Sequence, residues 1–323
     1  MGDKSKIEWL DGGASWNPIT GCTPISEGCA NCYAKTMAET RLRGMFGYDK
    51  EDPFKVTFHE DKVEQPFHWK RTRKIFICSM GDLFHEDVLD ENIDQIMSIV
   101  LADHVYNNTG KHTFILLTKR AERMRRYFRQ RDPIEMLKAW ANICPIYPND
   151  EDITFRDLVE SSVCMDWDKA GRNSSGSEYR PWGYINKLWP LPNLWLGVTA
   201  ENQRTADERI PILLDTPAAK RFVSVEPMLE QIDLNLFGNR RCGYVNKVQH
   251  TPGLVPSLVP VSFIDWVICG AETGQNSRPM DLKWARDLRN QCSEANIPFF
   301  FKKAGPNGTL IPVDLMIREY PKE

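Results

Sequence analysis

The sequence lacks the features that would carry a chain into or across a membrane. Residues 1–6 lead into the first apolar positions without a long hydrophobic run, and no later apolar stretch reaches the length of a bilayer span. We therefore expect a cytoplasmic protein that makes no contact with a membrane. Its nine cysteines are an odd number without a disulfide-like framework, which agrees with a reducing compartment.

A strong net charge is also missing. The chain carries 41 Lys and Arg against 44 Asp and Glu, a net charge of −3, so no general basic field attracts nucleic acid. The glycine fingerprint of a dinucleotide-binding fold is absent as well. What remains is an ordinary globular composition, and 323 residues suffice for one large domain or for a barrel with insertions.

Three cysteines stand close together in residues 20–33, at the spacing C-x6-C-x2-C: Cys22, Cys29 and Cys32. Glycine and proline between them allow the loop to fold back, so that the thiolates can meet at one metal centre. Structural zinc normally needs four ligands, and no fourth Cys or His is close by. A 4Fe–4S cluster with three thiolates keeps one iron open for a cofactor or substrate. The alternatives are a zinc site completed by a distant ligand, and three unrelated buried thiols.

Seven short apolar runs alternate with helical patterns along the chain. The first precedes the cysteines, and the others cover residues 74–79, 113–117, 193–198, 221–225, 263–269 and 297–301. The helices between them are expected near residues 33–43, 93–101, 120–129, 206–214 and 282–292. Strands that are apolar on both faces pair in parallel through crossover helices. This predicts an α/β fold, a partial or complete (β/α) barrel, in a single domain over residues 1–323.

Two stretches interrupt this alternation and are predicted to be insertions. Residues 132–192 contain many prolines and a patch rich in Gly, Ser and Asn, with a helix expected at 134–141. Residues 236–262 form a second irregular segment.

Polar residues follow the predicted strands one after another, where a barrel collects its functional groups. Each one alone is explained equally well as a cap or turn residue, but six clusters around one rim favour an active site. Beyond the cysteines they are Ser79, Gly81 and Asp82; Lys119 and Arg120; Thr199, Glu201 and Asn202; Glu226; and Glu272.

The helix predicted after Lys119 is strongly basic, with seven positive charges and one negative charge in residues 119–131. Lys119 and Arg120 stand at its N-terminus, where cations are disfavoured unless an anion is near. A phosphate-bearing substrate would supply that anion. The alternative is an ordinary solvated helix surface.

Blocks of sequence from the cysteine loop onward resemble a known family. They are Trp16–Cys22, Gly28–Ala34, Ser79–His85, Leu117–Arg120, Leu196–Asn202, Ser224–Pro227, Gly270–Gly274, Arg278–Met280 and Phe299–Lys302. In these blocks the chain resembles a phage- and prophage-associated radical-SAM family known by its three-cysteine motif, and more distantly spore photoproduct lyase. One departure is that the common radical-SAM loop is C-x3-C-x2-C with an aromatic residue just before the last cysteine. Here that position is Asn31, and Tyr33 lies beyond it, so adenine would be held differently.

The resemblance implies a partial barrel of the radical-SAM, TIM-like type, with a 4Fe–4S cluster on the three cysteines. The cluster would cleave S-adenosylmethionine reductively to a 5′-deoxyadenosyl radical, with electrons from a flavodoxin or ferredoxin type donor. The resemblance also implies cofactor contacts by Ser79, Met80, Gly81, Asp82, Thr199, Glu201, Asn202 and Tyr33.

For the reaction, the resemblance and the analogy with bacteriophage base chemistry imply hydrogen abstraction from a nucleic-acid base or nucleotide, as in DNA modification or repair. We expect catalytic roles for Lys119, Glu226, Glu272 and His85, and substrate contacts by Arg120 and Arg123. Two alternatives are radical modification of a peptide or partner protein, and a non-enzymatic, metal-bearing nucleic-acid-binding module.

Overall fold

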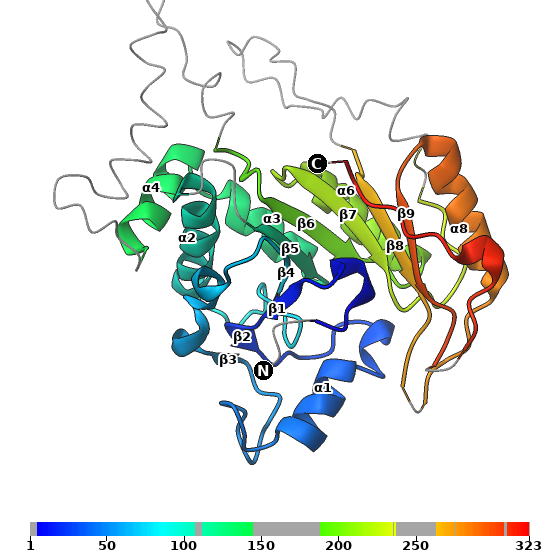
Figure 1. The fold of residues 1–323 in the computed structure, drawn as a ribbon, viewed down its shortest axis with the longest axis horizontal. Helices are drawn as coiled ribbons and strands as arrows, with labels where there is room; N and C mark the ends of the chain where they lie inside the picture. The colour runs from blue at the N-terminus through cyan, green and yellow to red at the C-terminus, as the bar shows by residue number, and fades with distance from the viewer. Residues whose placement is uncertain are drawn as a thin grey trace, which may run out of the picture. The chain divides into compact units, whose positions relative to one another are not determined.

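The computed structural model describes residues 5–106, 112–144, 188–234, 236, 263–274, 276–306 and 309–322. Seven strands form one sheet in the order β1 (Ala14–Trp16), β4 (Lys74–Ile77), β5 (Thr113–Thr118), β6 (Leu194–Thr199), β7 (Lys220–Val225), β8 (Trp266–Gly270) and β9 (Phe299–Lys303) (Figure 1). The pairs β1–β4, β4–β5, β7–β8 and β8–β9 are parallel. The predicted fold class is confirmed: it is an α/β fold of the partial (β/α) barrel type. Strands β4 to β9 overlap the six apolar runs predicted between residues 74 and 301, and β1 lies before the cysteines.

Long helices separate most of the strands: α2 (Asp90–Tyr106), α3 (Ala121–Arg129), α4 (Pro133–Ile143), α6 (Gln203–Asp215) and α8 (Leu282–Ala295). The helix expected over residues 33–43 is α1 (Tyr33–Met37), continued by a π-helical turn η3 (Ala38–Leu42), and Gly44 follows with φ 70°. On α6 the apolar pattern predicts an inner face of Ala206, Ile210, Leu213 and Leu214. The first three are buried, but Leu214 is only half-buried, and Arg209 also lies on the buried face.

The shorter elements complete the description. Strands β2 (Ile19–Thr20) and β3 (Thr57–Phe58) form a separate antiparallel pair. Single turns of 3-10 helix are η1 (Glu8–Leu10), η2 (Glu27–Cys29), η4 (Glu60–Lys62), η5 (Gln65–His68) and η8 (Val313–Leu315).

Contacts within the chain divide it into two compact units. The first comprises Met1–Ile25, Cys32–Leu196 and Thr216–Ala219, and the second comprises Ser26–Asn31, Gly197–Asp215 and Lys220–Glu323. In the first unit, α2 and α4 lie side by side (Figure 1), and Trp140 of α4 is fully buried. In the second unit, α8 packs beside β8 and β9.

The predicted insertions fall largely outside the described residues, since residues 145–187 and 237–262 are not described. The described start of the first one is α4, whose inner face of Met136, Leu137, Trp140 and Ala141 is buried. Within the residues that the structure describes, no helix combines the length and apolar character needed to cross a bilayer.

Candidate active site

The loop that carries the cysteines is held to the end of β4 by close backbone contacts. Gly21 forms a parallel bridge with Gly81, and the Gly21 N–H donates to the Met80 carbonyl at 2.9 Å. Gly21 has φ 84°, and a Cβ there would lie 2.0 Å from the Lys55 carbonyl oxygen. Only glycine fits at this position, because any other residue would be strained at this positive φ and its Cβ would clash with the backbone at Lys55.

The predicted cofactor turn, residues 79–82, lies beside the part of the cysteine loop that belongs to the first unit. The Tyr33 hydroxyl donates to the Ser79 carbonyl. Asn17 Oδ1 accepts from the Met80 N–H at 2.9 Å and from the Ser79 hydroxyl at 3.2 Å. Met80 itself belongs to a buried apolar cluster against which both Cys22 and Cys32 pack. Ser79, Met80, Gly81 and Tyr33 are therefore brought together with two of the three thiols.

Asp82 is the centre of a buried polar network behind this turn. Its Oδ1 accepts from the Thr118 hydroxyl at 2.7 Å and from the Phe84 N–H at 3.0 Å. Its Oδ2 accepts from the Lys119 N–H and from Arg120 Nη1, both at 3.3 Å. The carboxyl-end residues of β4 and β5 are thus joined through one carboxylate, and the backbone of Lys119 takes part in that junction.

Arg120 extends the network to the first cysteine. Its Nη1 donates to the sulfur of Cys22 at 3.3 Å, and its Nη2 donates to the carbonyl and hydroxyl oxygens of Thr23. Its Nε donates to Glu86 at 2.9 Å. Burial lowers the pKa of Arg120, but the Asp82 charge, the Glu86 hydrogen bond and the Cys22 thiol together raise the pKa above its ordinary value.

These contacts correct the sequence argument about the basic helix. That argument required a substrate phosphate as the anion near the N-terminus of α3, but Asp82 and Glu86 supply the anion from within the protein. Arg123 is also occupied internally, with hydrogen bonds to the carbonyls of His85 and Val88 and to the Asp90 carboxylate. Both Arg120 and Arg123 thus already have partners within the protein, and substrate contact by either one stays a prediction.

His85 also positions the cysteine loop. Its Nδ1 accepts from the Asp87 N–H at 3.1 Å, so in the neutral ring the proton resides on Nε2, which lies 2.8 Å from the Thr23 hydroxyl. Burial, followed by the charge of Arg120, lowers the pKa of His85 below its ordinary value. A neutral imidazole with both nitrogens engaged supports a positioning role better than proton transfer.

In the second unit, Glu201 holds the segment that contains Cys29. The Ser26 hydroxyl donates to Glu201 Oε1 at 2.6 Å and lies 3.6 Å from the Cys29 sulfur. Arg209 donates to Glu201 Oε2 at 2.9 Å and to the Thr199 carbonyl at 2.7 Å. Glu201 has no exposed surface, and burying its charge requires the partner that Arg209 provides. A charged residue within the apolar stripe of α6 was the sequence signal for Arg209.

Glu272 makes the second connection to this segment. Its Oε2 accepts from the Asn31 amide at 2.9 Å, and Arg278 pairs with the same carboxylate at 2.5 Å. Arg278 also donates to the Glu27 carbonyl at 3.0 Å. Burial raises the pKa of Glu272, but the hydrogen bonds from Arg278 and Asn31 and the charge of Arg278 outweigh it and lower the pKa to about 2. Glu272 is therefore ionised at neutral pH and is unsuited to proton transfer there.

Two predicted site residues, Asn202 and Glu226, form their hydrogen bonds and ion pairs with residues outside the cysteine loop. Asn202 accepts from the Thr205 N–H at 2.9 Å and receives the Thr205 hydroxyl, which is a helix cap at the start of α6. Glu226 pairs with Lys302 at 2.9 Å and accepts from the Ser224 hydroxyl at 3.1 Å. Asn202 thus follows the cap interpretation, whereas Glu226 belongs to a pair of its own.

The three motif cysteines differ from the other cysteines in exposure. The thiols of Cys22, Cys29 and Cys32 are half-buried, whereas those of Cys78, Cys144, Cys269 and Cys292 are buried. Cys22 and Cys32 belong to the first unit and Cys29 to the second, and no group of three His, Cys, Asp or Glu side chains in the described residues stands ready to hold a metal ion. In kind, however, three accessible thiols on one short loop are the donor set of an iron–sulfur cluster.

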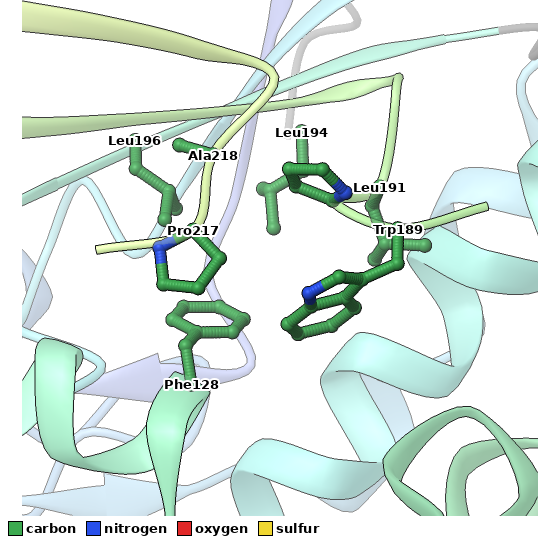
Figure 2. Close-up of a pocket in the computed structure, with 8 residues that line it drawn as sticks. Phe128, Trp189, Leu191, Leu194, Leu196, Pro217 and Ala218 are labelled. Carbon is green, nitrogen blue, oxygen red and sulfur yellow. The ribbon is translucent and has the colours of Figure 1, made fainter. Parts of the chain in front are cut away.

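An apolar pocket of the first unit contains none of the predicted site residues. Figure 2 shows Phe128 and Trp189 facing each other across it, next to residues that precede and begin β6. Its lining is made of apolar residues, including Leu191, Leu194, Leu196 and Pro217. The lining holds no charged side chain, and its one hydrogen-bonding side chain is the Trp189 indole, so the cysteine loop remains the candidate site.

One family profile, described as "Protein of unknown function (DUF5131)", matches residues 4–314 of the 323-residue chain. The chain belongs to this family. No curated protein and no solved structure matches the chain. The described DUF5131 fold and its cysteine loop therefore carry the functional argument, and the radical-SAM resemblance stays a prediction.

Proposed function

We propose that this protein is a radical-SAM enzyme that holds a 4Fe–4S cluster on Cys22, Cys29 and Cys32 and acts on a nucleic-acid base or nucleotide. The observation that carries the proposal is the contrast between these half-buried thiols and the buried thiols elsewhere in the described chain. Metal ligands must be reachable and deprotonated, and structural core cysteines are neither. None of the described cysteines forms a disulfide, which supports a reducing, cytoplasmic location.

A second observation supports the proposal: residues that follow several strands form hydrogen bonds with the cysteine loop. In the first unit, Arg120 and His85 both reach Thr23, and Arg120 also reaches the Cys22 sulfur. In the second unit, Glu201 and Glu272 hold Ser26 and Asn31, which flank Cys29. Partners that orient ligands in this way are the usual surroundings of a functional metal site.

When bound, the cluster supplies the electron that cleaves S-adenosylmethionine to the radical that takes a hydrogen atom from the substrate. The chain's own residues orient the reactants and exclude water. Residues 79–82 and Tyr33 are the proposed surroundings of S-adenosylmethionine, because they lie beside Cys22 and Cys32 through the shared cluster around Met80. A flavodoxin or ferredoxin type protein is the proposed electron donor.

The test is anaerobic reconstitution of the full chain with iron and sulfide, followed by dithionite and S-adenosylmethionine. We expect about four irons per chain and formation of 5′-deoxyadenosine, both lost in Cys22→Ser, Cys29→Ser and Cys32→Ser. Cys292→Ala is the matched control, because this thiol is buried in α8, and it should keep cluster and product. Zinc in place of iron, or a cluster that yields no 5′-deoxyadenosine, would overturn the enzyme proposal in favour of a metal-bearing binding module.

A further inference from the structure

Three neighbouring strands of the second unit meet at one ion pair, and two of them are irregular there. Glu226 follows the end of β7, and its Oε1 lies 2.9 Å from Lys302 Nζ of β9. Strand β8 runs between them in the sheet. The pair therefore spans the middle strand, which an ordinary side chain at that level would obstruct.

Strand β8 has a glycine where the pair crosses it. A Cβ built on Gly270 would lie 2.7 Å from Glu226 Oε1, closer than real Cβ contacts come. The Glu226 carboxylate is fixed over this glycine by the Ser224 hydroxyl, which donates to Oε2 at 3.1 Å, and Ser224 is fully buried. The absence of a side chain at residue 270 makes room for the carboxylate.

Strand β9 has an extra residue at the same level. Cys269 pairs with Phe301, but Gly270 pairs with Lys303, so Lys302 is the bulged residue of β9. A bulge re-aims one side chain and is found next to active sites more often than elsewhere. Here the re-aimed side chain is the Lys302 ammonium, which reaches the Glu226 carboxylate.

Stability does not account for this arrangement. The Lys302 and Glu226 side chains are 24% and 16% exposed, and a partly hydrated ion pair adds little to the free energy of folding. The bulge disrupts the hydrogen-bond ladder locally, and Gly270 at the end of β8 has no side chain to pack. The position at the carboxyl ends of parallel strands is where a (β/α) barrel binds its substrates.

We propose that Lys302 and Glu226 form a substrate-binding pair that hydrogen-bonds the edge of a nucleobase, an inference that rests on the proposed function and names its substrate contact. The ammonium donates to a ring nitrogen or carbonyl oxygen, and the carboxylate accepts from a neighbouring ring or amino N–H. Base edges present an acceptor beside a donor on one side of a rigid ring, which matches charged atoms 2.9 Å apart. The main-chain amide of a peptide does not, because its N–H and C=O point in opposite directions.

The test measures binding by equilibrium dialysis. The anaerobically reconstituted chain is dialysed against each of the four deoxynucleosides and, separately, against a short peptide containing Asn and Gln. We expect the wild type to bind at least one nucleoside. Lys302→Met and Glu226→Gln should each weaken that binding at least tenfold, as the loss of one charge-assisted hydrogen bond predicts. Lys302→Arg should keep it within a few-fold, because a guanidinium can both pair with Glu226 and donate to a base edge.

Lys138→Met is the matched control, since Lys138 pairs with Glu135 on the exposed face of α4 at 3.4 Å, and it should bind as the wild type does. The inference is overturned if Lys302→Met, folded by circular dichroism, binds nucleosides like the wild type. It is equally overturned if the wild type binds none of them or binds only the peptide. The 5′-deoxyadenosine assay on the same wild-type samples reports separately on the proposed function, so either proposal can fail without the other.

Discussion

Arg120 offers the sharpest single test of how the cysteine loop is held. Its side chain is 4% exposed and contacts the carboxylates of Asp82 and Glu86 as well as the Cys22 sulfur. Removing one partner of a buried ion pair costs about 3–5 kcal/mol, because the other charge stays buried. In Arg120→Met, Asp82 keeps three neutral donors, on Phe84, Thr118 and Lys119. We therefore expect a somewhat smaller loss of unfolding free energy, about 2–4 kcal/mol.

A double-mutant cycle with Asp82→Asn separates the pair from its surroundings. Because the two side chains are in contact, the double variant should be more stable than the sum of the single losses predicts, by at least about 1 kcal/mol. Urea denaturation followed by far-UV circular dichroism measures each free energy of unfolding.

Arg125→Met is the control. Arg125 lies on α3, the helix whose N-cap is Arg120, is 37% exposed and pairs with Glu122. The free energy of unfolding of Arg125→Met should therefore stay within about 0.5 kcal/mol of the wild-type value.

The same variants report on the loop. At a temperature where each variant is folded, iron bound after reconstitution should fall in Arg120→Met and stay at the wild-type level in Arg125→Met. Arg120 contacts Cys22 and Thr23, whereas Arg125 pairs with Glu122 at the surface. If Arg120→Met is no less stable than Arg125→Met, or if the double-mutant cycle is additive, the buried network does not exist as described.

Three further outcomes follow from the structure. Gly21→Ala should lower the free energy of unfolding, measured by urea titration, by at least about 3 kcal/mol, because the new Cβ would lie 2.0 Å from a carbonyl oxygen. Gly12, with φ 74°, has open space around it, so Gly12→Ala should cost only about 1–2 kcal/mol. Equal costs would refute the steric argument. In the metal-free chain, mass-spectrometric mapping of a thiol reagent should find Cys22, Cys29 and Cys32 labelled long before Cys292, because burial raises the pKa of Cys292 to about 12; simultaneous labelling would contradict this. The pKa of Glu272 is about 2 in the folded protein against an ordinary 4.5, so its contribution to the free energy of unfolding is complete above about pH 4.5 and is lost as the pH falls towards 2. Glu272→Gln should therefore flatten the dependence of stability on pH in this window. Glu208→Gln, at an exposed glutamate, should leave that dependence unchanged.

Much of the fold could be predicted from local sequence. A run such as residues 114–117 is apolar at every position, and this requires burial on both faces wherever the strand lies. Helix faces follow from spacing of the same local kind, as for Ala285, Leu288 and Cys292 of α8. The cysteine loop also stands out by itself, because thiols at short spacing between glycines need no distant partner to be recognised.

The site was predictable only as a set of positions, and the partners were decided by the tertiary structure. The sequence alone indicated that Arg120 needs an anion, and the folded chain places Asp82 and Glu86 there. The sequence also indicated Glu272 as a site residue. The partners of Glu272 are Asn31, which is 241 residues away in the chain, and Arg278, which is 6 residues away. Asn202, selected together with Glu201, is instead a helix cap.

What the sequence by itself determined was the alternation of elements and the loop that carries the thiols, because apolar periodicity and short spacings act locally. Only the tertiary structure decided which charges meet. The pairing of Glu226 with Lys302 depends on strand order, on a glycine in the intervening strand and on a one-residue bulge in β9. Strand order and the position of a bulge depend on contacts between segments far apart in the chain, so the spacing within one strand does not predict them.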